Sequence, residues 1–187
     1  MSPFFKYYSI CLTSLLVSGC IIVNTPGFYN GYKKLSDEEK KSVVLLKDDD
    51  SISQLKKDTT IYAINGKQLK NCLAANDTSV VYLWGPRCSS VSCILISSCQ
   101  DYCTQRSYKL YVVADYYDIE MMNAQNKANT PLLIANHIYY NRYYAGKLNS
   151  AFTSDLLNGT TLRGREQYNR FLFFKGDEFI FSKSNLF

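Results

Sequence analysis

The sequence predicts an α/β sandwich, with a central mixed sheet, flanking helices and a C-terminal β-hairpin. Between residues 59 and 159, β-type runs alternate with segments of helical spacing, a pattern that gives parallel strands joined by crossovers. The run SVVYLW at 79–84 is almost continuously apolar, which is typical of a strand buried on both faces. At the end of the chain, FLFFK and EFIFS flank Gly176-Asp177, which predicts a hairpin and an antiparallel edge.

The first half of this region alternates strand, helix, strand and helix. TTIYAI at 59–64 is a β-type run, and KQLKNCLAAN after it has apolar residues at helical spacing. The buried strand at 79–84 ends at Gly85-Pro86. From residue 89 to about 107, apolar positions recur every three or four residues, which predicts a second helix. We expect this helix to pack on the strand at 80–84 through Val91, Leu95 and Cys99.

The second half continues the alternation. YKLYVVADY at 108–116 predicts a strand, and DIEMMNAQNK predicts a helix with Asp118 as its N-cap. PLLIA gives a short strand that begins after Pro131. AFTSDLLNG predicts a helix that ends at Gly159, before the final hairpin. Between these elements, HIYYNRYYAGK mixes aromatic and basic residues; it predicts either a groove for a peptide or glycan, or an amphipathic turn and helix that pack on the sheet.

The N-terminus predicts export from the cytoplasm and a lipid anchor. Residues 1–19 combine a positive charge, a short apolar run and a small-residue end, the layout of a secretory signal. Val17-Ser18-Gly19-Cys20 resembles a bacterial lipoprotein box, which implies cleavage before Cys20 and lipidation of its thiol. Acyl chains on Cys20 would give stable anchoring to the membrane. An ordinary signal peptide that ends in cysteine and an uncleaved anchor are the alternatives.

We therefore expect three segments: a lipoprotein signal peptide at 1–19, a lipid-anchored polar tether at 20–58 with one short helix near 37–46, and one folded domain at 59–187. The expected location is the cell envelope, with the domain outside the cytoplasm. The net charge is +5, and basic and acidic residues are interspersed, so nucleic acid is not indicated as a partner. The membrane, and the thiols or disulfides of other proteins, are the expected partners.

Cysteine is the residue type most informative about chemistry. In the mature chain five would remain: Cys72, Cys88, Cys93, Cys99 and Cys103. An odd number in an oxidising compartment leaves at least one unpaired within the molecule. Cys72 is expected in the core. The other four follow at spacings of five, six and four along one predicted helix, which cannot converge on one ion, so neither a metal nor a cofactor is expected.

The stretch VVYLWGPRCSSVSC reads as a buried strand, a turn, a cysteine and the start of a helix. In this order of elements the chain, from about 59 to 182, resembles the thioredoxin superfamily, and in particular membrane-anchored periplasmic thioredoxins of the cytochrome-maturation type. The resemblance implies a thioredoxin-like sandwich and thiol–disulfide exchange.

The resemblance also assigns roles to single residues. Cys88 matches the attacking cysteine, and Trp84 matches the aromatic residue that ends the active-site strand; we expect Trp84 and its neighbour Arg87 to contact a substrate. Two positions depart from the pattern. Val91 stands where the resolving cysteine belongs, so Cys93, two residues later, or a partner thiol would have to release the substrate. No proline stands near Tyr168, where the family has a cis-proline. A non-catalytic thioredoxin-fold lipoprotein with a binding or structural role therefore stays open beside the redox function.

Helix geometry limits what the cysteines can do. A position at a helix N-terminus beside Arg87 would favour the thiolate of Cys88; a small buried residue is the alternative. In a regular helix the Cα atoms of residues five apart, such as Cys88 and Cys93, are about 8.7 Å apart, whereas a disulfide needs about 6.8 Å or less. A Cys88–Cys93 bond therefore requires an unwound first turn. His137, the only histidine, is expected to be a surface or hydrogen-bonded residue.

Overall fold

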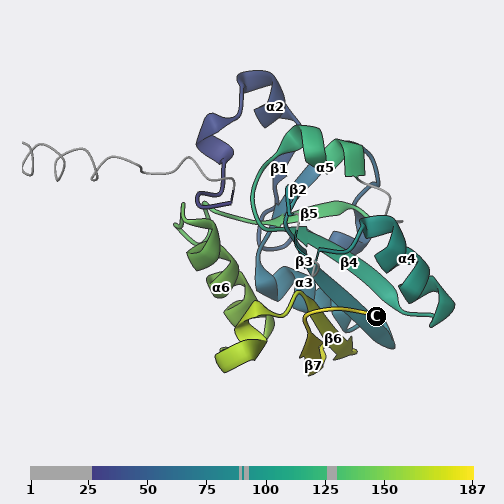
Figure 1. Cartoon of the computed structure of the whole chain (residues 1–187). Coiled ribbons are helices and arrows are strands. Elements are labelled where there is room, and N and C mark those ends of the chain that lie inside the picture. Colours follow the sequence, from purple (N-terminus) through teal and green to yellow (C-terminus); the bar gives the residue numbers. More distant parts are fainter. Residues whose placement is uncertain (1–26, 89, 91–92, 126–129) are drawn as a thin grey trace, which may run out of the picture.

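A mixed sheet of seven strands forms the centre of the molecule (Figure 1). The computed structural model describes residues 27–88, 90, 93–125 and 130–187. The strands lie in the order β1-β2-β5-β4-β3-β6-β7. Their bounds are β1 Val43–Leu45, β2 Ile61–Ile64, β3 Thr78–Trp84, β4 Lys109–Ala114, β5 Leu132–Ala135, β6 Phe171–Lys175 and β7 Glu178–Lys183. The first five strands of this order are parallel, and β6 and β7 are antiparallel to their neighbours. The expected α/β class, mixed sheet and terminal hairpin are confirmed.

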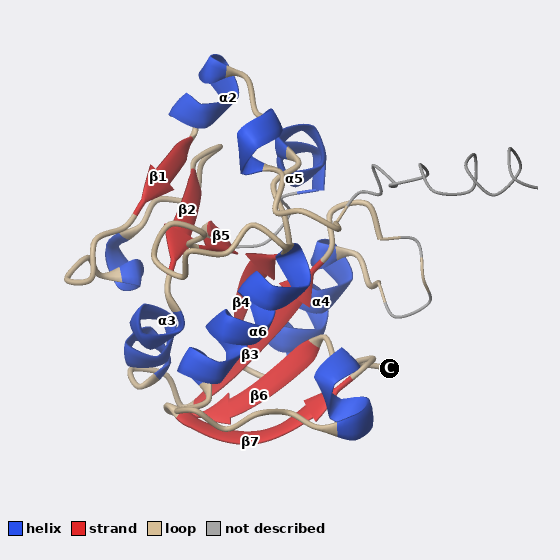
Figure 2. Ribbon diagram, turned by 90° about the vertical axis from the view of Figure 1, so that its left-hand side faces the viewer, coloured by secondary structure: helices blue, strands red, loops and turns tan. Residues whose placement is uncertain are grey.

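Helices cover both faces of the sheet (Figures 1 and 2). They are α2 Asp37–Lys41, α3 Gly66–Leu73, α4 Ile96–Gln105, α5 Ile119–Gln125 and α6 Ala145–Leu156, with short 3-10 turns η1 Tyr32–Lys34, η2 Ile52–Gln54 and η3 Gly164–Tyr168. Buried residues of α4 and α5 pack in one hydrophobic cluster, and those of α3 and α6 in the other. Neighbouring residues of a strand face opposite clusters: Ile61 joins the first and Tyr62 the second.

Local sequence signals explain how two of the helices begin. Asn65 and Gln68 form a reciprocal capping box at the start of α3, as each side chain bonds the main-chain N–H of the other. Asp118 accepts a hydrogen bond of 3.2 Å from the main-chain N–H of Met121, which confirms it as the N-cap of α5. At Gly66 an added Cβ would lie 2.4 Å from the carbonyl oxygen of Phe152, so the close approach of α3 and α6 requires glycine there.

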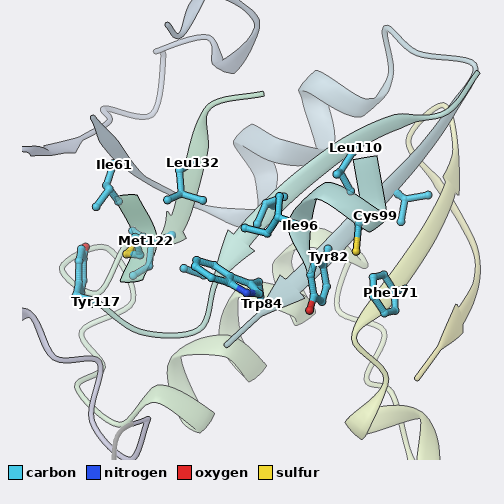
Figure 3. Close-up of a cluster of buried hydrophobic side chains, with 14 of the residues drawn as sticks. Ile61, Tyr82, Trp84, Ile96, Cys99, Leu110, Tyr117, Met122, Leu132 and Phe171 are labelled. Carbon is cyan, nitrogen blue, oxygen red and sulfur yellow. The ribbon is translucent and has the colours of Figure 1, made fainter. Parts of the chain in front are cut away.

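A cluster of buried side chains, which includes Cys99 of α4, packs α4 against the sheet (Figure 3). Tyr82 of β3 stacks on Phe171 of β6 with ring centroids 4.4 Å apart. Its hydroxyl donates a hydrogen bond of 2.9 Å to the carbonyl of Ile94, just before α4. Burial raises the pKa of the Tyr82 hydroxyl, so it stays a donor at neutral pH. The segment that leads into α4 is therefore held against the sheet by a buried side chain.

The helix predicted from residue 89 begins later than expected. It starts at Ile96, and its buried residues are Ile96, Cys99 and Cys103. Leu95 lies just before the helix and is 63% exposed, so the prediction that Leu95 packs on β3 is wrong. Val91 lies outside the described residues. The periodicity shifted by one residue because Leu95 and Ile96 are both apolar, and the spacing alone does not choose between them.

The segment before residue 59 is not a free tether over its described part. Strand β1 pairs in parallel with β2 at the edge of the sheet. Leu35, Leu46 and Ile52 are buried. The expected helix near 37–46 is confirmed only as α2, which ends at Lys41 before β1. Sequence analysis missed this packing because the few apolar residues that hold the segment are irregularly spaced. An edge strand such as β1 also relies on main-chain hydrogen bonds, which leave no pattern in the sequence.

The signal peptide and Cys20 lie outside the described residues. Among the residues described, none of the helices has the length and apolarity that crossing a bilayer requires.

Candidate redox site at the end of strand β3

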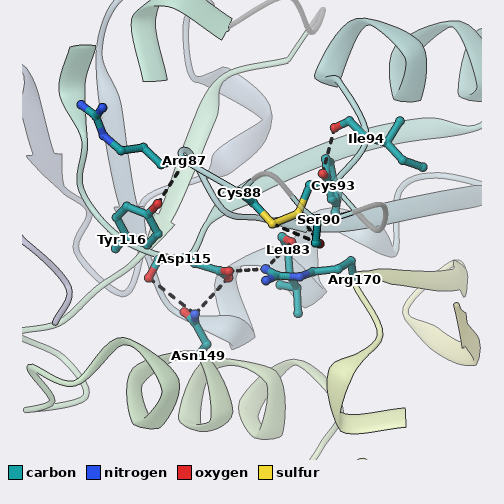
Figure 4. A network of polar contacts seen from close by, with 11 residues as sticks. Leu83, Arg87, Cys88, Ser90, Cys93, Ile94, Asp115, Tyr116, Asn149 and Arg170 are labelled. Carbon is teal, nitrogen blue, oxygen red and sulfur yellow. Dashed lines mark hydrogen bonds and ion pairs between the residues drawn. A yellow bond between two sulfur atoms is a disulfide. The ribbon is translucent and has the colours of Figure 1, made fainter. Parts of the chain in front are cut away.

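The turn after β3 places Cys88 just beyond the carboxyl end of this strand (Figure 4). The main-chain N–H of Cys88 donates a hydrogen bond of 3.0 Å to the carbonyl of Gly85, which closes a tight turn through Pro86 and Arg87. A Cβ added at Gly85 would lie 3.2 Å from the Cβ of Cys88, so a larger residue there would crowd the cysteine. The buried strand thus sets the position of Cys88 through a short, stiff connection.

Cys88 and Cys93 form a disulfide, with Cα atoms 5.8 Å apart. The distance is within the range that a disulfide allows, and helix α4 starts only at Ile96, after both cysteines. The hydroxyl of Ser90 lies 3.5 Å from the sulfur of Cys88 and 3.3 Å from that of Cys93. Neither cysteine lies in a helix, and both are half-buried rather than enclosed.

Two expected causes of a low Cys88 pKa are absent. Helix α4 starts at Ile96, well after Cys88, so the positive end of its dipole does not act on this sulfur. Arg87 forms an ion pair with Asp118 and lies 3.5 Å from Glu120. The carboxylates at the start of α5 therefore compensate most of the positive charge of Arg87.

A half-buried ion pair lies beside the disulfide, and sequence reasoning missed it. Asp115 follows β4, and Arg170 precedes β6. The N–H of Asp115 bonds the carbonyl of Trp84 at 2.8 Å, and the carbonyl of Arg170 accepts from the N–H of Leu83 at the same distance. Both residues are thus fixed to the end of β3, where their side chains form an ion pair. Asp115 directly follows a strand parallel to β3, and carboxyl ends of neighbouring parallel strands meet, a signal that could have found it.

The carboxylate of Asp115 has a second partner and a shifted pKa. The side-chain amide of Asn149, on α6, donates to it at 3.0 Å. Burial raises the pKa of Asp115, and the attraction of Arg170 opposes that shift without cancelling it. The guanidinium of Arg170 also donates to the carbonyl of Leu83 at 3.2 Å. The result is a carboxyl group that binds a proton more readily than an ordinary aspartate, close to the Cys88 turn.

A groove opens at this ion pair. One cavity of about 440 Å³ is lined by Gly27, Arg87, Cys88 and Tyr116 among others, and an adjoining cavity of about 650 Å³ extends between α6 and the η3 loop. The two share Asp115, Gly146, Asn149 and Arg170. The larger one is lined mainly by uncharged hydroxyl and amide side chains: Asn149, Ser150, Thr153, Ser154, Thr160, Thr161, Gln167 and Asn169. Such a lining suits a polar chain with many hydrogen-bonding groups, such as an extended peptide.

The remaining site predictions are placed as follows. Arg87 lies on the rim of the smaller cavity. Trp84 was expected to contact a substrate but is instead 2% exposed, and packs in the core beneath the turn. His137 is buried, with its ring 4.3 Å from that of Tyr32 and its Nδ1 3.4 Å from the Tyr117 hydroxyl, and burial lowers its pKa. It is a hydrogen-bonded histidine, one of the two expectations for it.

The other described cysteines are free thiols. Cys99 and Cys103 are buried, and burial raises the pKa of each to about 12. Cys72 is half-buried rather than fully in the core, with its sulfur 3.3 Å from the hydroxyl of Tyr111. In the described ranges, no three metal-binding side chains come together. Among these five cysteines, only Cys88 and Cys93 are joined to each other, and Cys88 lines the groove.

Comparisons with protein-family models, with curated proteins and with solved structures found no match. Function is therefore inferred from the chemistry of this site.

Proposed function

We propose that this chain is a thioredoxin-like lipoprotein of the bacterial cell envelope that carries out thiol–disulfide exchange through Cys88 and Cys93. The observation that carries the proposal is the half-buried disulfide at the carboxyl end of a central strand, which opens onto a groove beside a carboxylate of raised pKa. A lipid on Cys20 would hold the domain at the membrane, outside the cytoplasm, where disulfides persist.

Three features of the fold support a thioredoxin-like architecture. β4 and β3 are parallel, β6 and β7 follow as an antiparallel hairpin, and the cysteine segment lies between β3 and α4, which is the order of elements that the resemblance implies. Where the resemblance implies a proline, this chain has Tyr168-Asn169-Arg170 before β6. Here Arg170 occupies the space beside the disulfide turn and neutralises Asp115.

In the reducing direction, the thiolate of Cys88 attacks one sulfur of a substrate disulfide, and the other substrate sulfur leaves as a thiolate. Cys93 then attacks the Cys88 sulfur, which restores the Cys88–Cys93 bond and releases the second substrate thiolate. Two electrons pass from the protein dithiol to the substrate disulfide. Cys88 is assigned the attack because it lines the groove. The carboxyl of Asp115 can exchange a proton with a thiol in the groove.

The alternative is a thioredoxin-fold lipoprotein with a binding or structural role, in which the disulfide only fixes the loop before α4. It is favoured by the departures at Val91 and at 168–170. The two functions differ in one measurable property: a structural disulfide resists exchange, whereas a catalytic one equilibrates with small thiols.

The test is a redox titration of the full chain in glutathione buffers, followed by mass spectrometry of alkylated thiols. We expect reversible reduction of Cys88–Cys93 under native conditions, and faster alkylation of Cys88 than of Cys93 in the reduced protein. Cys93→Ser should trap a mixed disulfide on Cys88 with a disulfide substrate such as insulin, and Cys88→Ser should not react.

Cys72→Ser is the matched control and should behave as wild type. A bond that is reduced only when the protein unfolds, with equal and slow alkylation of both thiols, would favour the structural alternative.

A further inference from the structure

Four exposed aromatic residues gather where the described chain begins, and the thiol chemistry does not use them. We name Phe28, Tyr29, Tyr143 and Tyr144 the aromatic patch; each is between 41% and 50% exposed. The rings of Phe28, Tyr29 and Tyr144 contact one another, with centroids 5.0 to 5.5 Å apart. Exposed aromatic clusters of this kind mark contact surfaces on soluble domains.

Main-chain hydrogen bonds hold the patch in place. The N–H of Ala145 donates to the carbonyl of Phe28 at 3.1 Å, and the N–H of Asn30 donates to the carbonyl of Tyr143 at 2.7 Å. Tyr29 and Tyr144 form an isolated antiparallel bridge between these bonds. The N-terminal segment is thereby fixed to the start of α6, so the aromatic rings face outwards from a rigid base.

The patch is also positively charged. The ammonium of Lys33 lies 4.1 Å from the ring centroid of Tyr143, and that of Lys147 lies 5.7 Å from the centroid of Tyr144. The patch residues belong to the segments 27–34 and 137–147. These segments contain neither Asp nor Glu, and their basic residues are Lys33, Lys34, Arg142 and Lys147. Aromatic rings combined with lysine and arginine are the composition that favours the interface of an anionic bilayer.

The path of the chain identifies the occupant. Six residues lie between Cys20 and Gly27, and the seven steps from one Cα atom to the next span at most about 25 Å when fully extended. If Cys20 carries the lipid, the first described residue and the adjacent patch stay within that distance of the bilayer. No large rearrangement is needed for the rings to reach the headgroup region.

We propose that the aromatic patch, with Lys33, Arg142 and Lys147, docks on the headgroup region of the anionic membrane that holds the anchor. The inference rests on the proposed anchor at Cys20 and is independent of the thiol chemistry. Gly27, next to Phe28, also lines the cavity that contains Cys88. Docking would therefore hold the disulfide groove near the membrane surface rather than at the end of a free tether.

The experiment uses the full lipidated chain in vesicles of phosphatidylcholine, with or without phosphatidylglycerol. Hydroxyl-radical footprinting reports the oxidation rates of Tyr29 and Tyr144, with Tyr168, which is 73% exposed and outside the patch, as internal reference. We expect protection of the patch tyrosines by about fivefold or more relative to Tyr168 when phosphatidylglycerol is present, since each surface cation contributes about 1 kcal/mol to binding of anionic lipid.

The triple variant Lys33→Glu, Arg142→Glu, Lys147→Glu should lose this protection. The matched control Lys67→Glu, Lys109→Glu, Lys175→Glu makes the same change of charge at exposed lysines elsewhere and should keep it. Circular dichroism checks that both variants fold.

Patch tyrosines that oxidise alike relative to Tyr168 with both lipids and in both variants would overturn the proposal. So would protection that rises with protein density but not with phosphatidylglycerol, which would indicate a second copy of the chain as occupant. Exchange with a soluble disulfide, measured in the same vesicles, tests the proposed function separately: Cys88→Ser should abolish exchange and leave the protection unchanged.

Discussion

At the scale of single residues, the site depends on where each side chain is anchored. Reactivity of Cys88 was predicted from a helix dipole and from Arg87, but α4 begins only at Ile96 and Arg87 forms an ion pair with Asp118. The accessibility of Cys88 instead comes from the turn at Gly85 and the groove beside it. The residue that could tune it is Asp115, whose pKa is raised by burial despite its ion pair with Arg170.

Asp115 gives a prediction on stability against pH. Because its folded-state pKa lies above the unfolded value of about 3.9, its contribution to the free energy of unfolding is fully present below that pH and is lost as pH rises through the folded pKa. Asp115→Asn should remove this decline. Urea unfolding of both proteins across the acidic range checks it, with the difference between the two curves as the readout. Parallel curves would show that the carboxyl does not titrate abnormally.

At the scale of elements, one residue of register decides how α4 packs. The buried face runs through Ile96, Cys99 and Cys103, so Leu95 is left outside. The hydrogen bond between Tyr82 and the carbonyl of Ile94 fixes the point at which the chain enters the helix. This bond holds Ile94 in the described segment just before the helix.

This register predicts opposite outcomes for two neighbouring substitutions. Ile96→Ala should lower the free energy of unfolding by about 2–5 kcal/mol, because it leaves a cavity between α4 and the sheet. Leu95→Ala should change it by about 0.5 kcal/mol or less, since the side chain is mostly in solvent. Chemical denaturation of both variants, with the disulfide intact, measures the difference. A larger loss at Leu95 than at Ile96 would contradict the register.

At the scale of the whole molecule, the described part of the N-terminal segment belongs to the fold. Residues that composition assigned to a tether supply the edge strand β1, and main-chain bonds from Asn30 tie the segment to Tyr117 and Tyr143. If Cys20 carries the proposed lipid, the reach of the few residues between it and Gly27 limits how far the disulfide groove can lie from the membrane.

Substitution within this segment tests whether it belongs to the fold. Ile52 is buried, whereas Val44 on the edge strand is exposed. Ile52→Ala should cost about 2–5 kcal/mol of unfolding free energy, and Val44→Ala, the control, much less. If both substitutions leave the midpoint of denaturation unchanged, the segment is a tether after all.

The anchor has its own test. Cys20→Ala should leave an unprocessed precursor that incorporates no labelled palmitate in a bacterial host, because the modified thiol is gone. Gel mobility and acyl labelling measure processing and lipidation, and Cys11→Ala is the matched control within the apolar run. Normal cleavage and labelling of Cys20→Ala would remove the lipoprotein from the proposal.

The sequence by itself determined the alternation of strands and helices, the hairpin at Gly176-Asp177 and the N-cap at Asp118, because hydrophobic periodicity and turn chemistry are local properties. The motif around Cys88 was also local, so its place after the buried strand could be predicted.

Only the tertiary structure decided what surrounds the cysteine. Asp115, Asn149 and Arg170 come from three distant parts of the chain. The fold brings them together near the carboxyl end of the inner strand β3. The pairing of β1 depends on main-chain bonds at the edge of the sheet. The aromatic patch depends on main-chain bonds between residues more than a hundred positions apart. Neither kind of bond leaves a periodic pattern in the sequence. Helix and strand patterns can be seen in a short stretch of sequence, whereas these long-range contacts depend on the order of the strands in the sheet.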